Sequence, residues 1–159
     1  MRSLLLPCLL ALSLTLVSCG SSDPKKEGLE AIQSGKWDEA VASLDKAIAG
    51  LPAEAPDYME IAMGRCTALA HVDAPRAKAE FETLIQSGKT QMADFSTIVS
   101  HLMAANEYVP AIELMDKGLK QFPEQPEMVN LRNRVVLESK ASGSPEAQNA
   151  LKGLGYAGD

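Results

Sequence analysis

One pattern of small and large residues recurs three times in this chain and limits its fold more than any other feature. A small residue is followed by a large apolar residue four positions later and, three positions after that, by a mostly small residue, as in Ala40-Leu44-Ala47, Ala77-Phe81-Leu84 and Ala111-Met115-Gly118. Spacings of four and three place each trio on one face of a helix. The copies lie 37 residues (40 to 77) and 34 residues (77 to 111) apart. Repeats of this length are typical of stacked helix pairs, so the pattern predicts an all-α fold.

The residues around the pattern resemble the tetratricopeptide repeat (TPR). A turn residue, an aromatic residue, the trio and a terminating proline follow one another in residues 35–52 and again in residues 106–123. First helices of the family type are visible in Tyr58-x2-Ile61-Ala62 and in Phe95-x2-Ile98-Val99-x2-Leu102. The resemblance implies a right-handed superhelical array of antiparallel helix pairs, with about three units over residues 24–123.

The first and middle units depart from the family pattern. The first unit has Glu27-Gly28-x2-Ala31 without the usual aromatic residue and leucine, so we expect a short or loosely packed first helix. The middle unit has Arg65 where a large aromatic residue is usual. It also lacks a turn glycine or asparagine and has about three extra residues near His71. The turn inside the middle unit is therefore the least family-like part of the array.

Helix-start signals support this division of the chain. Asp23-Pro24, residues 54–57 and Asp73-Ala74-Pro75 each combine a capping residue with a proline that a first helical turn tolerates. Beyond residue 123, an apolar face over residues 126–139 predicts a capping helix for the last unit. We therefore assign residues 24–141 to the array with its capping helix, and residues 142–159 to a short helix and a glycine-rich tail.

The first 18 residues are typical of an export signal. Arg2 precedes an apolar run from Leu4 to Val17, which is too short to span a bilayer comfortably. The run ends in Leu16-Val17-Ser18-Cys19, which resembles the lipobox of bacterial lipoproteins. The resemblance implies that Cys19 is diacylated, by palmitate or a similar chain, and then N-acylated. A plain secretory signal and an uncleaved membrane anchor remain the alternatives.

The predicted lipid decides where the mature protein would lie. Two or more acyl chains anchor a protein stably to a membrane. In the lipoprotein family an acidic residue after the cysteine favours the inner membrane, and Gly20 is not acidic. We therefore expect the periplasmic face of the outer membrane. Residues 19–23 form the lipidated cysteine and a tether of about 13 Å, which would hold the first unit against the membrane.

Composition and motifs argue against catalysis and nucleic-acid binding. The net charge is −6, and no Lys/Arg run is longer than Lys25-Lys26, which disfavours a nucleic-acid surface. His71 and His101 have no partner at metal-ligand spacing, and no phosphate loop or nucleophile motif occurs. Cys66 is the only cysteine outside the leader and the lipobox, and we expect it to be a buried apolar residue. We predict no catalytic residue, metal, cofactor or small-molecule substrate, and no enzymatic activity.

The family resemblance implies that a protein or peptide partner binds the concave surface formed by the first helices. The corresponding positions are Met59, Met63, Cys66, Thr67, Ser96, Ser100, Met103 and Ala104. They contain no Lys, Arg or Asn, so a clamp for a terminal carboxylate is not expected. Flexible methionines suit an apolar helix or an extended segment. The alternative is that these methionines pack against the neighbouring unit.

The sequence therefore predicts a membrane-anchored scaffold or adaptor of the bacterial cell envelope. A self-associating structural protein, in which array ends pair between copies, is the first alternative. An enzyme with a cryptic site is the second, and the scarcity of histidine, cysteine and paired acids disfavours it.

Overall fold

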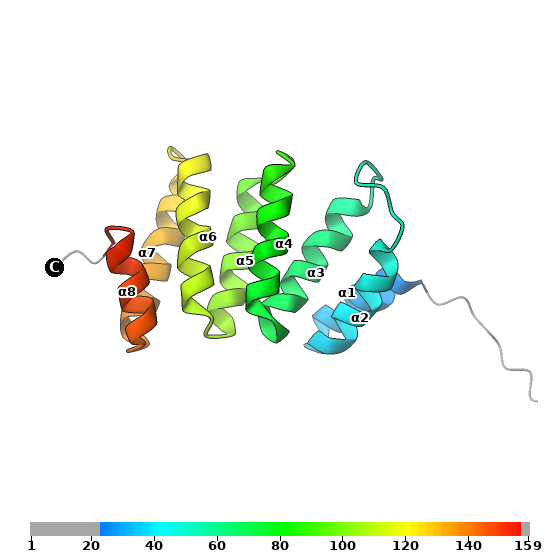
Figure 1. Ribbon diagram of the computed structural model, residues 1–159, viewed down its shortest axis with the longest axis horizontal. Coiled ribbons are helices and arrows are strands. Elements are labelled where there is room, and N and C mark those ends of the chain that lie inside the picture. Colours follow the sequence, from blue (N-terminus) through cyan, green and yellow to red (C-terminus); the bar gives the residue numbers. More distant parts are fainter. Residues whose placement is uncertain (1–22, 157–159) are drawn as a thin grey trace, which may run out of the picture.

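The computed structural model describes residues 23–156, which fold into eight α-helices without a strand in that range (Figure 1). The helices are α1 (Pro24–Gln33), α2 (Trp37–Ile48), α3 (Tyr58–Val72), α4 (Ala74–Gln86), α5 (Met92–Ala104), α6 (Tyr108–Gln121), α7 (Pro126–Ala141) and α8 (Pro145–Gly153). The all-α prediction is confirmed. The predicted leader and the predicted lipid site, Cys19, lie outside the described residues. Within those residues, no helix combines the length and the apolar character needed to cross a membrane.

The helices form two rows, of which the first runs from α1 to α7 and the second from α4 to α8. In the first row α1 contacts α3, α3 contacts α5, and α5 contacts α7. In the second row α4 contacts α6, and α6 contacts α8. Each odd-numbered helix packs against the even-numbered helix that follows it, and Figure 1 shows α4, α6 and α8 side by side in front of α5 and α7. Each apolar helix face is thereby covered by a neighbour.

Local capping interactions fix the helix starts that the sequence predicted at Asp23 and Asp73. The Asp23 carboxylate accepts a hydrogen bond from the Lys25 backbone N–H at 3.0 Å, and Asp73 accepts one from the Arg76 backbone N–H at 3.1 Å. Ser144 caps α8 in the same way. These bonds satisfy backbone donors that have no partner inside the helix, and a proline occupies the first turn each time.

The residues of the recurring pattern form the contact between the rows. Eight of the nine are buried and Ala47 is half-buried. Phe81 packs edge-to-face on Phe95 with ring centroids 5.1 Å apart, and Phe95 packs likewise on Phe122. At Gly118 the helices approach so closely that an added Cβ would lie 2.9 Å from Phe95 Cδ1. The small residues are thus required by helix proximity, as the pattern predicts.

The C-terminal segment folds back on the array. The predicted capping helix is α7, whose Met128, Leu131 and Val135 are buried, and α8 packs on α6 and α7. After α8, the Tyr156 hydroxyl donates a hydrogen bond to Asp116 Oδ1 at 2.8 Å. The Asp116 side chain also pairs with Lys120 Nζ at 2.6 Å. Tyr156 therefore belongs to the folded body.

Candidate functional site

Three of the eight predicted groove residues are in the interior. Cys66 is 1% exposed, Thr67 6% and Met103 7%, so none offers a surface to a partner. For α3 the cause is its central place, since it contacts α1, α2, α4 and α5. These three residues must be removed from the predicted binding surface.

The other five predicted residues are accessible to different degrees. Met59 and Met63 are half-buried and pack against the main core. Ser96 and Ser100 on α5 are half-buried, and Ala104 at the end of α5 is exposed. The methionines therefore fill space between elements of the array, as the alternative interpretation has it, while the serines remain at the surface.

The serines line a groove between α5 and α7. This groove has a volume of about 340 Å³ and is lined by Ser96, Ser100, Glu127, Asn130, Leu131 and Arg134. Arg134 Nη2 donates to Ser100 Oγ at 2.6 Å, and Ser100 donates to the Ser96 carbonyl at 2.6 Å. The groove thus offers an apolar floor with an amide and charges of both signs. The α7 residues were not predicted, because the sequence identified α7 only as a cap.

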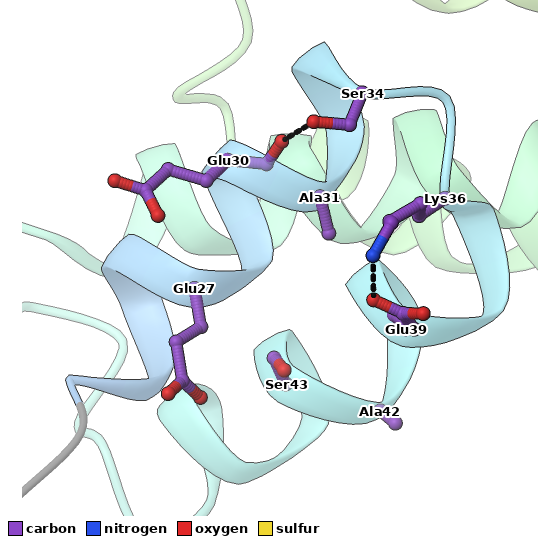
Figure 2. Close-up of a pocket in the computed structure, with 8 residues that line it drawn as sticks. All are labelled: Glu27, Glu30, Ala31, Ser34, Lys36, Glu39, Ala42 and Ser43. Carbon is purple, nitrogen blue, oxygen red and sulfur yellow. Dashed lines mark hydrogen bonds and ion pairs between the residues drawn. The ribbon is translucent and has the colours of Figure 1, made fainter.

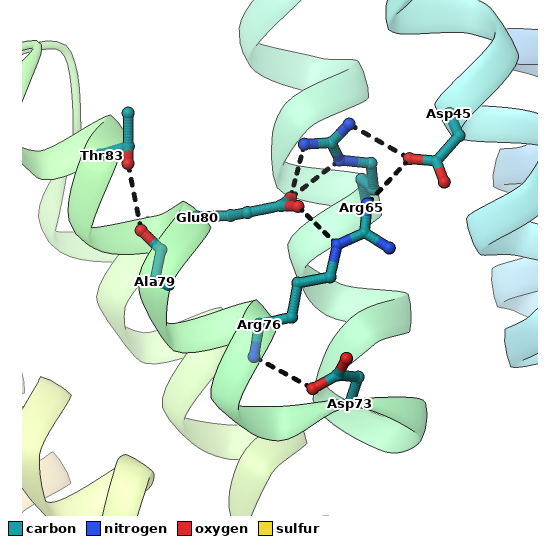
Figure 3. A network of polar contacts seen from close by, with 7 residues as sticks. All are labelled: Asp45, Arg65, Asp73, Arg76, Ala79, Glu80 and Thr83. Atoms are coloured by element: carbon teal, nitrogen blue, oxygen red, sulfur yellow. Dashed lines mark hydrogen bonds and ion pairs between the residues drawn. The ribbon is translucent and has the colours of Figure 1, made fainter.

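A charged network lies on the second-row side of α3 (Figure 3). Arg65 on α3 binds Glu80 on α4 through Nε at 2.8 Å and Asp45 on α2 through Nη1 at 3.1 Å. Arg76 binds the same two carboxylates, at 2.9 Å to Glu80 and 3.3 Å to Asp45. Two cations and two anions are matched, so the network links α2, α3 and α4 through ion pairs. It leaves no uncompensated charge for a ligand.

Cys66 lies behind this network. Burial, followed by the nearby Glu80 carboxylate, raises the pKa of the Cys66 thiol to about 12. The thiolate is the nucleophilic form of cysteine, and at neutral pH the thiol stays protonated. Cys66 is a structural residue in this fold.

A second groove of about 460 Å³ separates α1 from α2 at the N-terminal end of the array (Figure 2). Ala31, Ala42 and Ser43 lie on its sides, with Glu27, Glu30 and Glu39 at its rim. Lys36 Nζ pairs with Glu39 Oε2 at 3.0 Å. The acidic side chains are exposed to solvent, as is usual for a helix surface. We assign no ligand to this groove.

The structure brings together two histidines that the sequence treated as unrelated. His71 and His101 come from α3 and α5, and their ring nitrogens are in hydrogen-bonding contact. Thirty residues separate them in the chain, so no spacing rule could pair them. Within residues 23–156, no group of three or more histidine, cysteine, aspartate or glutamate side chains could hold a metal ion.

Comparison with known proteins does not assign the chain to a family. No protein-family model matches the chain, and no curated protein or solved structure is significantly similar to it.

Proposed function

We propose that the chain is a TPR-type lipoprotein of the bacterial envelope that is anchored through Cys19 and holds a protein partner in the groove between α5 and α7. The observation that carries the proposal is the agreement between the recurring pattern and the helix packing. The same trio of positions recurs in α2, α4 and α6, and its members are buried or half-buried where the rows meet. Such arrays present their first helices to partners as an extended surface.

The groove between α5 and α7 suits an extended or helical segment of mixed polarity. Leu131 is itself buried and closes the floor of the groove, while Asn130 and Arg134 at its sides offer donors to backbone carbonyls or to an acidic side chain. Glu127 can accept from a basic side chain at the other rim. The α7 side chains thus add polar chemistry to the partner surface expected from the first helices alone.

A photoreactive residue in place of Asn130, introduced in the native cell, would crosslink the partner if it occupies this groove. The same residue in place of Ala79, which is exposed on α4 in the second row, is the control for random encounter. We expect a discrete crosslinked product from position 130 and none from position 79. Equal products from both positions would contradict the proposed face.

Filling the groove provides an independent test. Ser96→Met adds a flexible apolar side chain to the groove wall, and Ala79→Met adds the same side chain to the other row. We expect the first variant to lose the crosslink from position 130 and the second to keep it, with unchanged helical circular dichroism in both.

The anchor is tested separately. Cys19→Ala removes the only side chain that the lipobox pattern modifies, so the variant should no longer incorporate labelled fatty acid and should retain its leader. Labelling at the wild-type level in this variant would exclude Cys19 as the lipid site.

Self-association is a second candidate, and one observation favours it. Leu137 on α7 is 70% exposed, the highest value among the large apolar residues that the structure describes. Light scattering of the leaderless protein distinguishes the two functions. A concentration-dependent increase in mass that Leu137→Lys abolishes would support pairing through α7, and a constant monomer mass would exclude it.

A further inference from the structure

Three aromatic rings from three helices meet at one end of the array. Trp37 is the first residue of α2, His71 lies in the last turn of α3, and His101 lies in the last turn of α5. The Trp37 and His71 rings are stacked, with centroids 3.8 Å apart and an interplanar angle of 3°. His71 Nε2 lies 3.0 Å from His101 Nδ1. All three side chains are half-buried.

The distance between the two nitrogens restricts the number of protons that the pair can hold. At 3.0 Å one nitrogen must donate its hydrogen and the other must accept it through a lone pair. A histidine cation has a hydrogen on both nitrogens and accepts nothing. The contact therefore accommodates two neutral rings or one cation, and two cations would place two N–H groups and two like charges against each other.

The surroundings do not compensate a second charge. Within the described part of the chain, neither ring forms an ion pair with a carboxylate, and three charged groups on the surrounding elements are engaged elsewhere. Lys36 before α2 pairs with Glu39, Asp73 after α3 caps α4, and Arg76 on α4 binds Asp45 and Glu80. Asp38 on α2 and Glu107 before α6 are exposed to solvent.

The pKa values of the two rings also indicate that the site does not stabilise positive charge. Burial lowers the pKa of His71 below its usual 6.5, and a positive charge on His101 lowers it further. Burial alone lowers the pKa of His101. Both rings are consequently neutral at pH 7 and become charged only in more acidic solution.

We propose that the His71–His101 pair is a proton-sensitive latch. It holds the ends of α3 and α5 together when at most one of the two rings is a cation, and it releases them when both rings are cations. Trp37 holds the His71 ring flat against α2, so release also loosens the first unit. The latch is independent of any partner. Its effect on the partner groove, one wall of which is α5, rests on the proposed function above.

The chain contains a single tryptophan, so its fluorescence reports on the surroundings of Trp37, which contacts both imidazole rings. A stacked imidazolium quenches indole emission, and we expect the emission of the leaderless protein to fall between pH 8 and pH 4.5 with a midpoint below 6.5. His71→Gln keeps a donor at the Nε2 position and should reduce the transition to the smaller contribution of His101, whose ring centroid lies 6.0 Å from that of Trp37. His101→Asn keeps a polar atom at the Nδ1 position, removes the second charge, and should raise the midpoint. Emission that is independent of pH in the wild type would overturn the proposal, as would an identical midpoint in His101→Asn.

Hydrogen exchange tests the release itself. At pH 5, the amides of the last turns of α3 and α5 should exchange faster in the wild type than in a variant that carries both substitutions, while the amides of α6 exchange equally in the two. Equal protection of all three segments at pH 5 would show that the rings titrate without opening, and would refute the latch. Circular dichroism at pH 7.5 verifies that each variant is folded. If the double variant is not, either folded single variant serves as the reference.

Discussion

Gly118→Ala tests whether the recurring small residues are set by helix proximity. Gly118 is the last residue of the third trio and lies inside α6, where alanine is intrinsically preferred over glycine by about 1 kcal/mol. Against this gain, the new Cβ would lie 2.5 Å from Met128 Cε and 2.9 Å from Phe95 Cδ1. Both distances are under 3.0 Å, so both side chains would have to move.

The two neighbours differ in their ability to move. The Met128 methyl group is the end of a flexible side chain and can rotate away at little cost. The Phe95 ring cannot, because it is fully buried between Phe81 at 5.1 Å and Phe122 at 5.8 Å. Overpacking of this kind costs about 1 to 3 kcal/mol, which exceeds the helix-propensity gain. We expect a net loss of about 1 kcal/mol.

Thermal and urea unfolding of the leaderless protein would measure the difference. A loss of 1 kcal/mol should lower the melting temperature by about 3 to 5 °C for a chain of this size. Gly153→Ala is the matched control, since an added Cβ there meets no atom within 4 Å and should leave stability unchanged or slightly higher. If Gly118→Ala melts at or above the wild-type temperature, close helix approach is not the reason for a small residue at this position.

Three further predictions concern ionisable groups. Because the pKa values of His71 and His101 are lowered in the folded chain, the unfolded chain binds more protons as the pH falls through 6.5. The free energy of unfolding should therefore decrease as the pH falls below about 6.5 and level off below the folded-state pKa values. In urea titrations, a variant with His71→Gln and His101→Asn should show a weaker dependence of this free energy on pH. Cys66, with its thiol pKa raised to about 12, should resist alkylation at pH 8 in the native protein and react fully in denaturant, and rapid native labelling would contradict its burial. Tyr156→Phe removes a hydrogen bond to the buried Asp116 carboxylate and should cost about 1 to 2 kcal/mol in urea unfolding, whereas Tyr108→Phe, which loses only an exposed bond to Asn106, should cost less.

The predictable parts of this fold are those that depend on near neighbours in the chain. A cap such as Asp73 acts on a backbone N–H three residues away, so its role is visible in a short stretch of sequence. The trio positions are likewise read from one helix, because the periodicity of a helix determines which residues share a face. Turn residues with a left-handed backbone conformation can also be predicted from the local sequence. Gly35 and Asn106 occupy equivalent turn positions and have φ values of 68° and 62°.

The burial of Cys66, Thr67 and Met103 depends on how many neighbours each helix has. The sequence treated α3 as a helix with one free face, but in the structure it contacts four other helices. One signal of this was present. The run from Cys66 to Ala70 contains no charged residue and only one polar residue, Thr67, and a helix that is apolar all round is a buried helix. The contact between His71 and His101 had no such signal, because it depends on how the ends of α3 and α5 are placed.

Side-chain size at equivalent positions explains why the groove opens between α5 and α7. Met59 and Met63 on α3 occupy the positions that Ser96 and Ser100 occupy on α5, 37 residues later. On α3 the long methionine side chains reach the core and fill the space beside the helix. On α5 the serines end after one heavy atom beyond Cβ, and Ser100 folds back on its own helix through the Ser96 carbonyl. The space that methionine fills in one unit is therefore left open in the next, so a partner has room beside α5 without displacing any part of the core.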